Sequence, residues 1–203
     1  MRPDNEALIV IDVQNDFCLN GALAVIDGDA VVAPINAMLP DFSACILTQD
    51  WHPSEHSSFA STHDGRSTFD IIEMPYGHQI LWPDHCIQST DGAAFHRELK
   101  IETADLIIRK GFRPQIDSYS AFFENDKTTP TGLEGYLHTR GIDTVTIVGL
   151  ATDFCVAYSA LDASNLGFKV TVDMTACRSI DMDGSLEGAI LKMRNAGVRL
   201  KHG

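Results

Sequence analysis

The stretch Thr144-Val145-Thr146-Ile147-Val148-Gly149-Leu150-Ala151-Thr152-Asp153-Phe154-Cys155-Val156-Ala157 begins with a β-branched run that ends at a glycine. Short apolar runs bounded by turn residues are typical of fully buried strands in a parallel sheet. The residues after Gly149 change to a pattern typical of a helix. The sequence therefore predicts a buried strand that passes directly into a helix, with Cys155 at the helix N-terminus.

A cysteine in this position is a candidate nucleophile. A helix N-terminus carries partial positive charge and unpaired backbone N–H groups. We therefore expect it to lower the pKa of the Cys155 thiol and to hold the oxyanion that forms when a thiolate attacks a carbonyl. The alternative interpretation is that Cys155 is a small apolar residue on a buried helix face.

The same alternation of elements continues along the chain. Besides the run at 145–148, short apolar runs occur at 7–11, 44–48, 106–108, 170–172 and 198–200, and helix-like stretches at 30–39, 132–140, 153–165 and 184–196. This order predicts an α/β fold with a doubly wound, mainly parallel sheet flanked by helices. The chain has 203 residues, 44% of them hydrophobic, and no linker-like stretch, so we expect a single domain over 1–203.

Residues 50–104 do not fit the alternation. They are rich in His, Pro, Ser, Asp and Gly and show little periodicity. A long segment of this kind inside a compact domain usually has a function. We therefore interpret it as a loop insertion that builds part of a binding site.

Composition excludes several classes of partner. The formal net charge of −13, from 28 acidic and 15 basic residues, argues against binding to nucleic acid or to an anionic membrane surface. The first apolar run is too short for a signal-peptide core or a membrane span, so we expect a cytoplasmic protein. Five scattered cysteines do not suit a disulfide framework and are expected to be reduced thiols, namely Cys18, Cys45, Cys86, Cys155 and Cys177.

Polar residues stand at the carboxyl ends of the predicted strands, where an open parallel sheet binds ligands. Asp12 ends the first strand, Lys110 lies at the end of the third, and the fourth leads to Cys155. An acid beside a thiol can take its proton, and an ammonium beside both favours their charged forms. Taken singly, Asp12 could cap a turn and Lys110 could be a solvated charge, but their shared position favours a catalytic group.

A second group of side chains has the spacing of metal ligands. Asp50 and His52 follow the second strand, where residues two apart point to the same side and can reach one ion. His85 can add a third ligand from the far part of the long segment, and His56 is a further candidate as a ligand or as a partner of the ligands. Two histidines and a carboxylate suit Zn²⁺, Fe²⁺ or Mn²⁺. The other five histidines are interpreted as surface or loop residues: His63, His78, His96, His138 and His202.

The same ligand set occurs as the facial triad of non-haem iron oxygenases, which offers an alternative function. An oxygenase of this kind does not need an acid, an ammonium and a thiol at neighbouring strand ends. That alternative therefore leaves the predicted catalytic group unexplained.

Several segments together resemble the nicotinamidases, also called pyrazinamidases, within the isochorismatase-like cysteine hydrolases. The resemblance extends from Ala7 to about Leu200. The segments IVIDVQNDF at 9–17 and GLATDFCV at 149–156 are shared by the whole superfamily. The segments TQDWHP at 48–53 and LWPDHC at 81–86 are typical of nicotinamidases and their metal, and the set is completed by KG at 110–111 and DSYSAF at 117–122.

The resemblance implies roles for these residues. The implied catalytic triad is Asp12, Lys110 and Cys155. The implied ligands are Asp50, His52 and His85, which would hold one divalent ion, with zinc expected first and iron or manganese as alternatives; the role of His56 stays open.

The resemblance also implies how a substrate would be bound. A cis peptide is implied between Leu150 and Ala151, and the backbone N–H groups of Ala151 and Cys155 would form the oxyanion hole. The side chains implied along the substrate ring are Phe17, Trp82 and Tyr119, although core packing is the ordinary role of a single aromatic residue.

The implied activity is the hydrolysis of nicotinamide to nicotinate and ammonia through a cysteine thioester, in NAD salvage. Pyrazinamide is a further candidate substrate. Two alternatives stay open: another cysteine hydrolase of the superfamily acting on a different amide or carbamoyl substrate, and a non-catalytic ligand-binding member. The oligomeric state also stays open, a homo-oligomer included.

Overall fold

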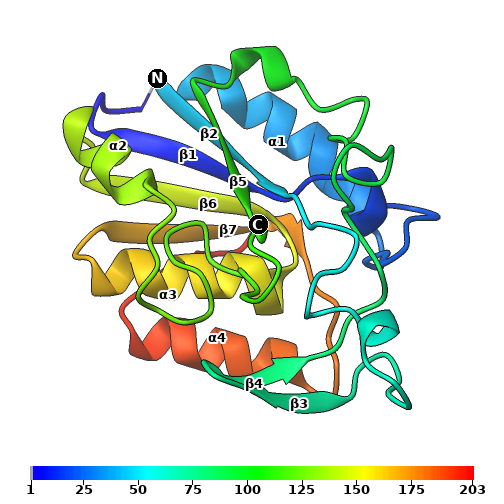
Figure 1. Cartoon of the computed structure of the whole chain (residues 1–203). Coiled ribbons are helices and arrows are strands. Elements are labelled where there is room, and N and C mark those ends of the chain that lie inside the picture. The colour runs from blue at the N-terminus through cyan, green and yellow to red at the C-terminus, as the bar shows by residue number, and fades with distance from the viewer. Residues whose placement is uncertain (1) are drawn as a thin grey trace.

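The computed structural model describes residues 2–203 and contains a six-stranded sheet with the order β5-β2-β1-β6-β7-β8 (Figure 1). All of its neighbouring strands are parallel. The predicted parallel sheet flanked by helices is therefore confirmed. The strands are β1 Glu6–Ile11, β2 Ala44–Asp50, β5 Leu106–Lys110, β6 Thr144–Leu150, β7 Lys169–Arg178 and β8 Arg199–Lys201.

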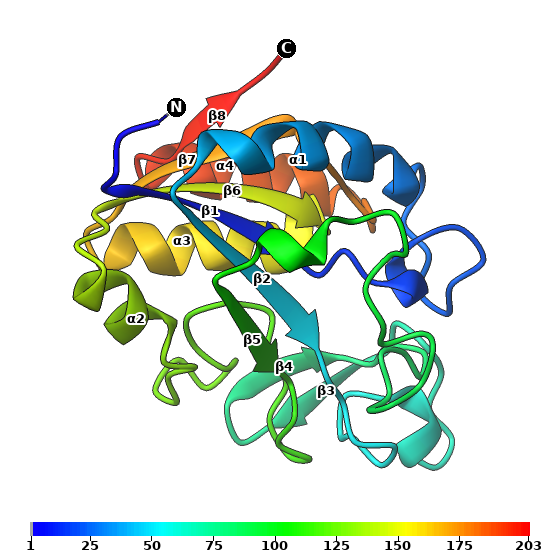
Figure 2. The same cartoon turned by 90° about the horizontal axis from the view of Figure 1, so that it is seen from above.

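Four α-helices connect these strands: α1 Val32–Met38, α2 Leu133–Thr139, α3 Ala157–Asn165 and α4 Ser185–Asn195. The chain moves from β1 to β2 in one direction along the sheet and from β6 through β7 to β8 in the other. Because crossovers between parallel strands are right-handed, α1 covers one face, and α3 and α4 cover the other (Figures 1 and 2). Within residues 2–203, no helix has both the length and the apolar character that a bilayer span requires.

Burial of the central strands explains why the sequence predicted them correctly. Every residue of β1 and β2 is buried, and so is every residue of β6 after Thr144. Strands covered on both faces read as continuous apolar runs, which is the pattern in the sequence. Their carboxyl ends are therefore held inside the protein.

Gly149 lets β6 end very close to β1. It lies opposite Ile11 in the sheet and has a φ of +116°, and a Cβ at this position would overlap the backbone of Ile11. A π-helical turn, Thr152–Val156, follows and leads into α3. The Leu150–Ala151 peptide is cis, as predicted.

The long segment between β2 and β5 contains structure that the sequence did not reveal. An antiparallel hairpin is formed by β3 Ile71–Met74 and β4 Gly77–Ile80, and short 3₁₀ turns occur at Ala60–Thr62 and Ile101–Thr103. Only Gln79 of the hairpin strands is buried, so no clear apolar alternation marks them. The assignment of 50–104 as an insertion in a single domain stays a prediction.

Candidate active site

The ends of three strands bring Asp12, Lys110 and Cys155 together. Lys110 Nζ lies 2.8 Å from Asp12 Oδ2 and 3.5 Å from Cys155 Sγ. A carboxylate oxygen of Asp12 lies within 4.8 Å of the same sulfur. Asp12 and Lys110 are fully buried, and Cys155 is 7% exposed. An acid, an ammonium and a thiol are thus in mutual reach and shielded from bulk water.

The Asp12 carboxylate is oriented by its backbone and by one hydroxyl group. Asp12 follows β1 with a φ of +48°, in the left-handed region that Asp tolerates better than most residues. Its N–H donates to Thr48 Oγ1 at 3.1 Å, and the Thr48 hydroxyl donates to Asp12 Oδ1 at 2.6 Å. Oδ2 is paired with the Lys110 ammonium and receives no other hydrogen bond from the described residues. This oxygen therefore retains the capacity to accept a proton.

Burial controls the protonation of this group. It raises the pKa of the Cys155 thiol well above its ordinary value, although the charge of Lys110 opposes the shift. The predicted lowering of this pKa is therefore wrong, because desolvation outweighs the favourable charges. Burial also raises the pKa of Asp12 to about 6, again against Lys110. The resting thiol is therefore protonated, and Asp12 lies beside it as a candidate base.

The residues predicted as metal ligands also converge. His52 Nδ1 donates to the carbonyl of Gly111 at 2.8 Å, and His85 Nδ1 donates to the carbonyl of Pro83 at 2.8 Å. These bonds leave each Nε2 free, and the two Nε2 atoms lie 3.7 and 3.9 Å from Asp50 Oδ2. Carbonyl partners of this kind fix the ring tautomer for metal binding. The donor set therefore fits a divalent cation such as Zn²⁺.

Lys110 links the two groups. Asp50 and Lys110 are partners in the register of β2 and β5, and Lys110 Nζ donates to Asp50 Oδ1. Gly111 follows with a φ of +66°, and a Cβ there would overlap the His52 ring. Lys110 therefore places its ammonium between Asp12 and Asp50, and Gly111 leaves room for the imidazole ring of His52.

His56 is oriented differently from the other two histidines. Its Nδ1 contacts Ser58 Oγ at 2.7 Å and its Nε2 contacts the Ile116 carbonyl at 3.2 Å. Both ring nitrogens are thus occupied, and the ring packs 4.4 Å from that of His52, measured between centroids. The ligand atoms of His52, His56 and Asp117 also lie within 4.8 Å of one another, so a metal-binding role for His56 stays a prediction.

A small cavity lies beside the sulfur. The three predicted aromatic residues line it together with Ala151 and Cys155, and its other lining residues are Leu23, Asp50, His85, Asp117, Phe154 and Ile180. Its volume is about 20 Å³, which is room for one water molecule. Trp82 Nε1 donates to the Tyr119 hydroxyl at 2.9 Å, so the aromatic wall is internally bonded.

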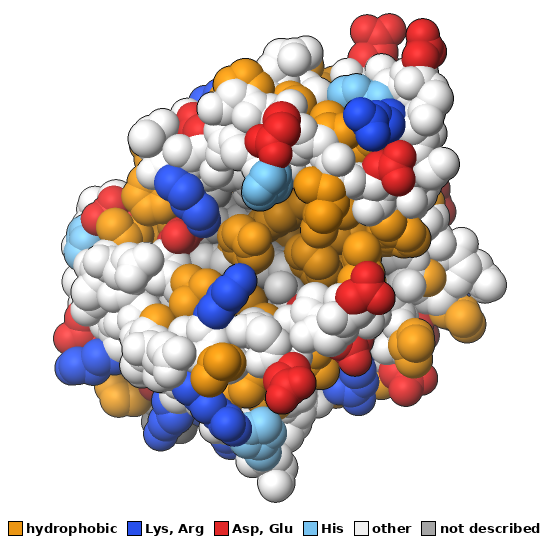
Figure 3. Space-filling model, turned by 90° about the horizontal axis from the view of Figure 1, so that it is seen from below, with side chains coloured by type: hydrophobic (Ala, Val, Ile, Leu, Met, Phe, Trp, Pro, Cys, Tyr) orange, Lys and Arg blue, Asp and Glu red, His pale blue; other side chains and the backbone are white. Residues whose placement is uncertain are grey.

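Phe154 is a lining residue that the sequence did not single out, although it directly precedes Cys155. It also borders a wider groove of about 870 Å³ between α3, α4 and the β3–β4 hairpin. Hydrophobic side chains gather in the hollow on this face (Figure 3). Phe154 therefore separates the groove from the cavity. No sequence signal marks Leu23 or Ile180, which come from distant loops.

Comparisons with known proteins agree with this geometry. The isochorismatase domain family matches residues 6–201. A nicotinamidase from Acinetobacter baylyi is 55% identical over 198 residues, which cover 98% of this chain and 92% of the relative. The solved structure of an Acinetobacter baumanii nicotinamidase and pyrazinamidase has a TM-score of 0.98 at 55% identity and covers 100% of this chain and 98% of its own.

A more distant solved structure adds a metal. Pyrazinamidase of Pyrococcus horikoshii in complex with zinc has a TM-score of 0.79 at 33% identity, with 98% of this chain and 99% of that chain covered. The family match and the full-length identity together place the sequence: the chain belongs to the isochorismatase domain family and, within it, to the nicotinamidases.

Proposed function

We propose that this amidohydrolase converts nicotinamide and water into nicotinate and ammonia, as an enzyme of NAD salvage. The observation that carries the proposal is the buried contact of Lys110 with both Asp12 and Cys155 in a chain with nicotinamidase relatives. The substrate is a small molecule. Pyrazinamide is a further candidate, because its carboxamide and ring nitrogens offer the same chemistry.

The first half of the reaction forms a thioester. Asp12 takes the proton of the Cys155 thiol, and the thiolate attacks the carboxamide carbon. The N–H groups of Ala151 and Cys155 stabilise the resulting oxyanion. Asp12 then returns the proton to the departing nitrogen, so ammonia leaves and the acyl group stays on sulfur.

The second half restores the thiol. Asp12 takes a proton from water, the hydroxide attacks the thioester carbonyl, and Cys155 leaves as the thiolate and recovers the proton. Lys110 remains charged throughout: burial opposes its charge, but Asp12 and Asp50 raise its pKa well above the ordinary value. The ammonium therefore balances the carboxylates while the sulfur changes charge.

Asp50, His52 and His85 would hold one divalent ion, for which zinc is our first choice and iron or manganese the alternatives. When bound, the ion would supply a coordination site for the pyridine nitrogen and so orient the carboxamide toward sulfur. His56 would keep the His52 ring in place. Phe17, Trp82 and Tyr119 would contact the faces and edges of the ring.

The cavity is too small for an aromatic amide in this conformation. Drug-sized ligands occupy pockets of roughly 300–1,000 Å³, and even a single ring needs far more than the observed volume. Since Phe154 separates the cavity from the wider groove, we infer that its movement admits the substrate. Its ring is 7% exposed and packs against Trp82 with a centroid distance of 5.0 Å.

An ammonia-release assay on nicotinamide tests the proposal. The wild-type enzyme should release ammonia, Cys155→Ala should release none, and mass spectrometry should find an aldehyde analogue of nicotinamide on Cys155. Labelling confined to Cys18, Cys45, Cys86 or Cys177 would overturn the assignment. Faster turnover of a carbamoyl substrate or another amide would instead favour the alternative hydrolase. The cytoplasmic location stays a prediction, and the oligomeric state stays open.

A further inference from the structure

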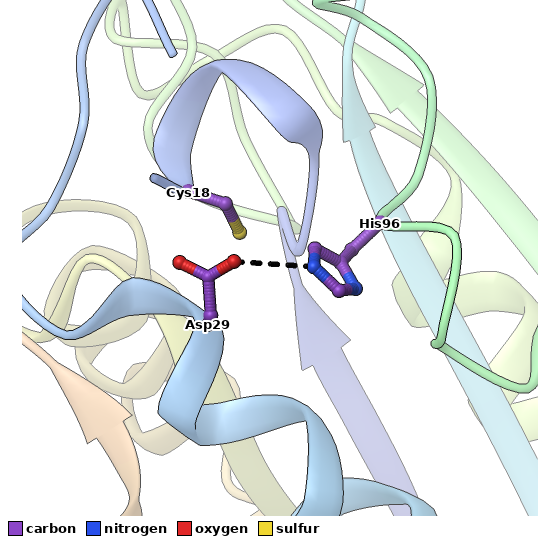
Figure 4. A group of neighbouring side chains, drawn as sticks. All are labelled: Cys18, Asp29 and His96. Atoms are coloured by element: carbon purple, nitrogen blue, oxygen red, sulfur yellow. Dashed lines mark hydrogen bonds and ion pairs between the residues drawn. The ribbon is translucent and has the colours of Figure 1, made fainter. Parts of the chain in front are cut away.

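Cys18, Asp29 and His96 meet away from the catalytic strand ends. Cys18 follows the 3₁₀ turn Asn15–Phe17, Asp29 lies in the 3₁₀ turn Gly28–Val31, and His96 belongs to the long segment before β5. One ligand atom from each residue lies within 4.8 Å of the other two. Figure 4 shows the Cys18 sulfur and a ring nitrogen of His96 pointing toward the Asp29 carboxylate. From the sequence, Cys18 is expected to be a reduced thiol and His96 an ordinary surface or loop residue.

We propose that Cys18, Asp29 and His96 form a second metal-binding site, for a thiophilic divalent cation such as Zn²⁺. A thiolate, a carboxylate and an imidazole are the three ligand types that zinc uses in proteins. A hollow of about 590 Å³ borders all three residues, so solvent can reach a bound ion. Three protein ligands and one solvent ligand complete a tetrahedral site.

The spacing of the ligand atoms suits such an ion. Neighbouring ligands around tetrahedral zinc lie roughly 3.3–3.7 Å apart, given bond lengths near 2.0–2.3 Å. His96 Nε2 already lies 3.2 Å from Asp29 Oδ1. The Leu19 N–H donates to Asp29 Oδ2 at 2.8 Å, which orients the carboxylate with Oδ1 toward the histidine. The sulfur lies within 4.8 Å of the other two ligand atoms, so a shift of at most about 1 Å brings it to the spacing of a tetrahedral site.

Binding requires changes in protonation. Burial and the charge of Asp29 raise the pKa of Cys18 to about 12, so the thiol proton must leave when the ion binds. The backbone N–H of Leu19 holds the pKa of Asp29 below its ordinary value, so the carboxylate is already charged. The Nε2 proton of His96 passes to Nδ1, at the cost of a 3.2 Å hydrogen bond from the Glu98 N–H. Binding thus displaces the thiol proton and breaks this hydrogen bond, so the affinity should stay below that of closed structural zinc sites.

The position of this site relates it to the substrate cavity. Phe17 directly precedes Cys18, and Leu23 lies between Cys18 and Asp29 in the sequence. Both side chains line the cavity beside the nucleophile. An ion held by Cys18 and Asp29 would join the two ends of this segment and restrict part of the cavity wall.

Cobalt(II) titration tests the site without relying on activity. Cobalt bound to a thiolate shows strong near-ultraviolet charge-transfer absorption, whereas the carboxylate and imidazole ligands at Asp50, His52 and His85 do not give this band. Wild-type protein should bind two equivalents and show the band. Cys18→Ser should lose the band and one equivalent, and His96→Gln, a change at a partly exposed residue, should also lose one equivalent.

Cys45→Ser is the matched control. Cys45 is as buried as Cys18, at 3% against 2% exposure, and has Asp105 as an acidic neighbour. It belongs to no group of three candidate ligands among residues 2–203. This variant should keep both equivalents and the band. A wild-type protein that shows no thiolate band at saturating cobalt, or a band that disappears in Cys155→Ala and survives in Cys18→Ser, would overturn the proposal.

Discussion

The strand ends and the long segment between β2 and β5 contribute to one site in different ways. Asp12, Lys110 and Cys155 come from the edge of the buried sheet and are held by charge contacts with one another. His52 and His85 come after the sheet and are held by hydrogen bonds to backbone carbonyls. The first group is fixed by strand register and the second by local chain geometry.

This difference suggests that the strand ends carry out the reaction and that the long segment helps to select the amide substrate. In the proposed mechanism, the rigid strand ends keep Asp12, Lys110 and Cys155 aligned for proton transfer and bond formation. In the proposed function, His52, His85 and Trp82 of the long segment help to orient the substrate, the two histidines through an ion and Trp82 as one part of the aromatic wall. We therefore expect changes at the strand ends to reduce turnover of every amide, and changes in the segment to alter the choice between amides.

The largest effect is expected at the strand ends. Asp12→Asn and Lys110→Met should each lower kcat by roughly 10⁴-fold or more, close to the loss in Cys155→Ala, because residues that act as a unit fail together. The asparagine is nearly isosteric, so the loss reports proton transfer. The measurement is ammonia release from nicotinamide and benzamide, which should fall in parallel. A Lys110→Met enzyme that keeps most of its kcat would refute the charge-balance role.

The next largest effect is expected at the metal ligands. The ring nitrogen of nicotinamide can bind an ion, whereas benzamide has carbon at that place. His52→Ala or chelation should lower kcat/KM for nicotinamide by roughly 100-fold and leave benzamide much less affected. Unpaired polar groups can also produce strong discrimination, so the comparison must be made with and without metal. An unchanged preference would mean that the ion is structural and that Phe17, Trp82 and Tyr119 select the ring.

The same two regions show what a sequence can predict. The central strands could be predicted because burial on both faces leaves a continuous apolar run. The predicted carboxyl ends of the strands then pointed to Asp12, Lys110 and Cys155. The hairpin formed by β3 and β4 was missed because only one of its strand residues is buried, which leaves no clear apolar alternation. The direction of the Cys155 pKa shift was wrong because the depth of burial depends on tertiary packing.

Other features of the site could not be predicted for related reasons. The role of His56 depends on where its two ring nitrogens point, and this is set by Ser58 and by Ile116, sixty residues away. Leu23 and Ile180 reach the cavity from loops without a motif.

A smaller effect, on stability, should separate two glycines with nearly the same backbone. Gly149 and Gly77 have φ values of +116° and +113°, but a Cβ at Gly149 would overlap the Ile11 backbone, while a Cβ at Gly77 meets open space. Gly149→Ala should therefore destabilise the fold by about 3 kcal/mol or more, and Gly77→Ala by about 1 kcal/mol. Urea unfolding measures both. Equal losses would mean that the strand edge is less rigid than its packing indicates.

The smallest effect is expected in the pH dependence of the strand-end group. Asp12 must be ionised to accept the thiol proton, and burial raises its pKa from 3.8 to about 6. With this raised pKa, Asp12 loses its ability to accept a proton already at about pH 6. We therefore expect kcat/KM to fall about tenfold for each pH unit below about 6, whereas an ordinary carboxyl group would cause this fall only below 3.8.

The choice of substrate separates this titration from that of the metal ligands. Burial lowers the pKa of His85 to about 4, so loss of the ion at low pH would also reduce nicotinamide turnover. Benzamide has no ring nitrogen to coordinate, so its acid limb reports Asp12 with less influence from the ion. We expect kcat/KM for benzamide to begin to fall near pH 6. The metal content of the enzyme is measured at each pH as a control. A benzamide limb near pH 4 would show that Asp12 titrates as an ordinary carboxyl group and that burial does not prepare it as the base.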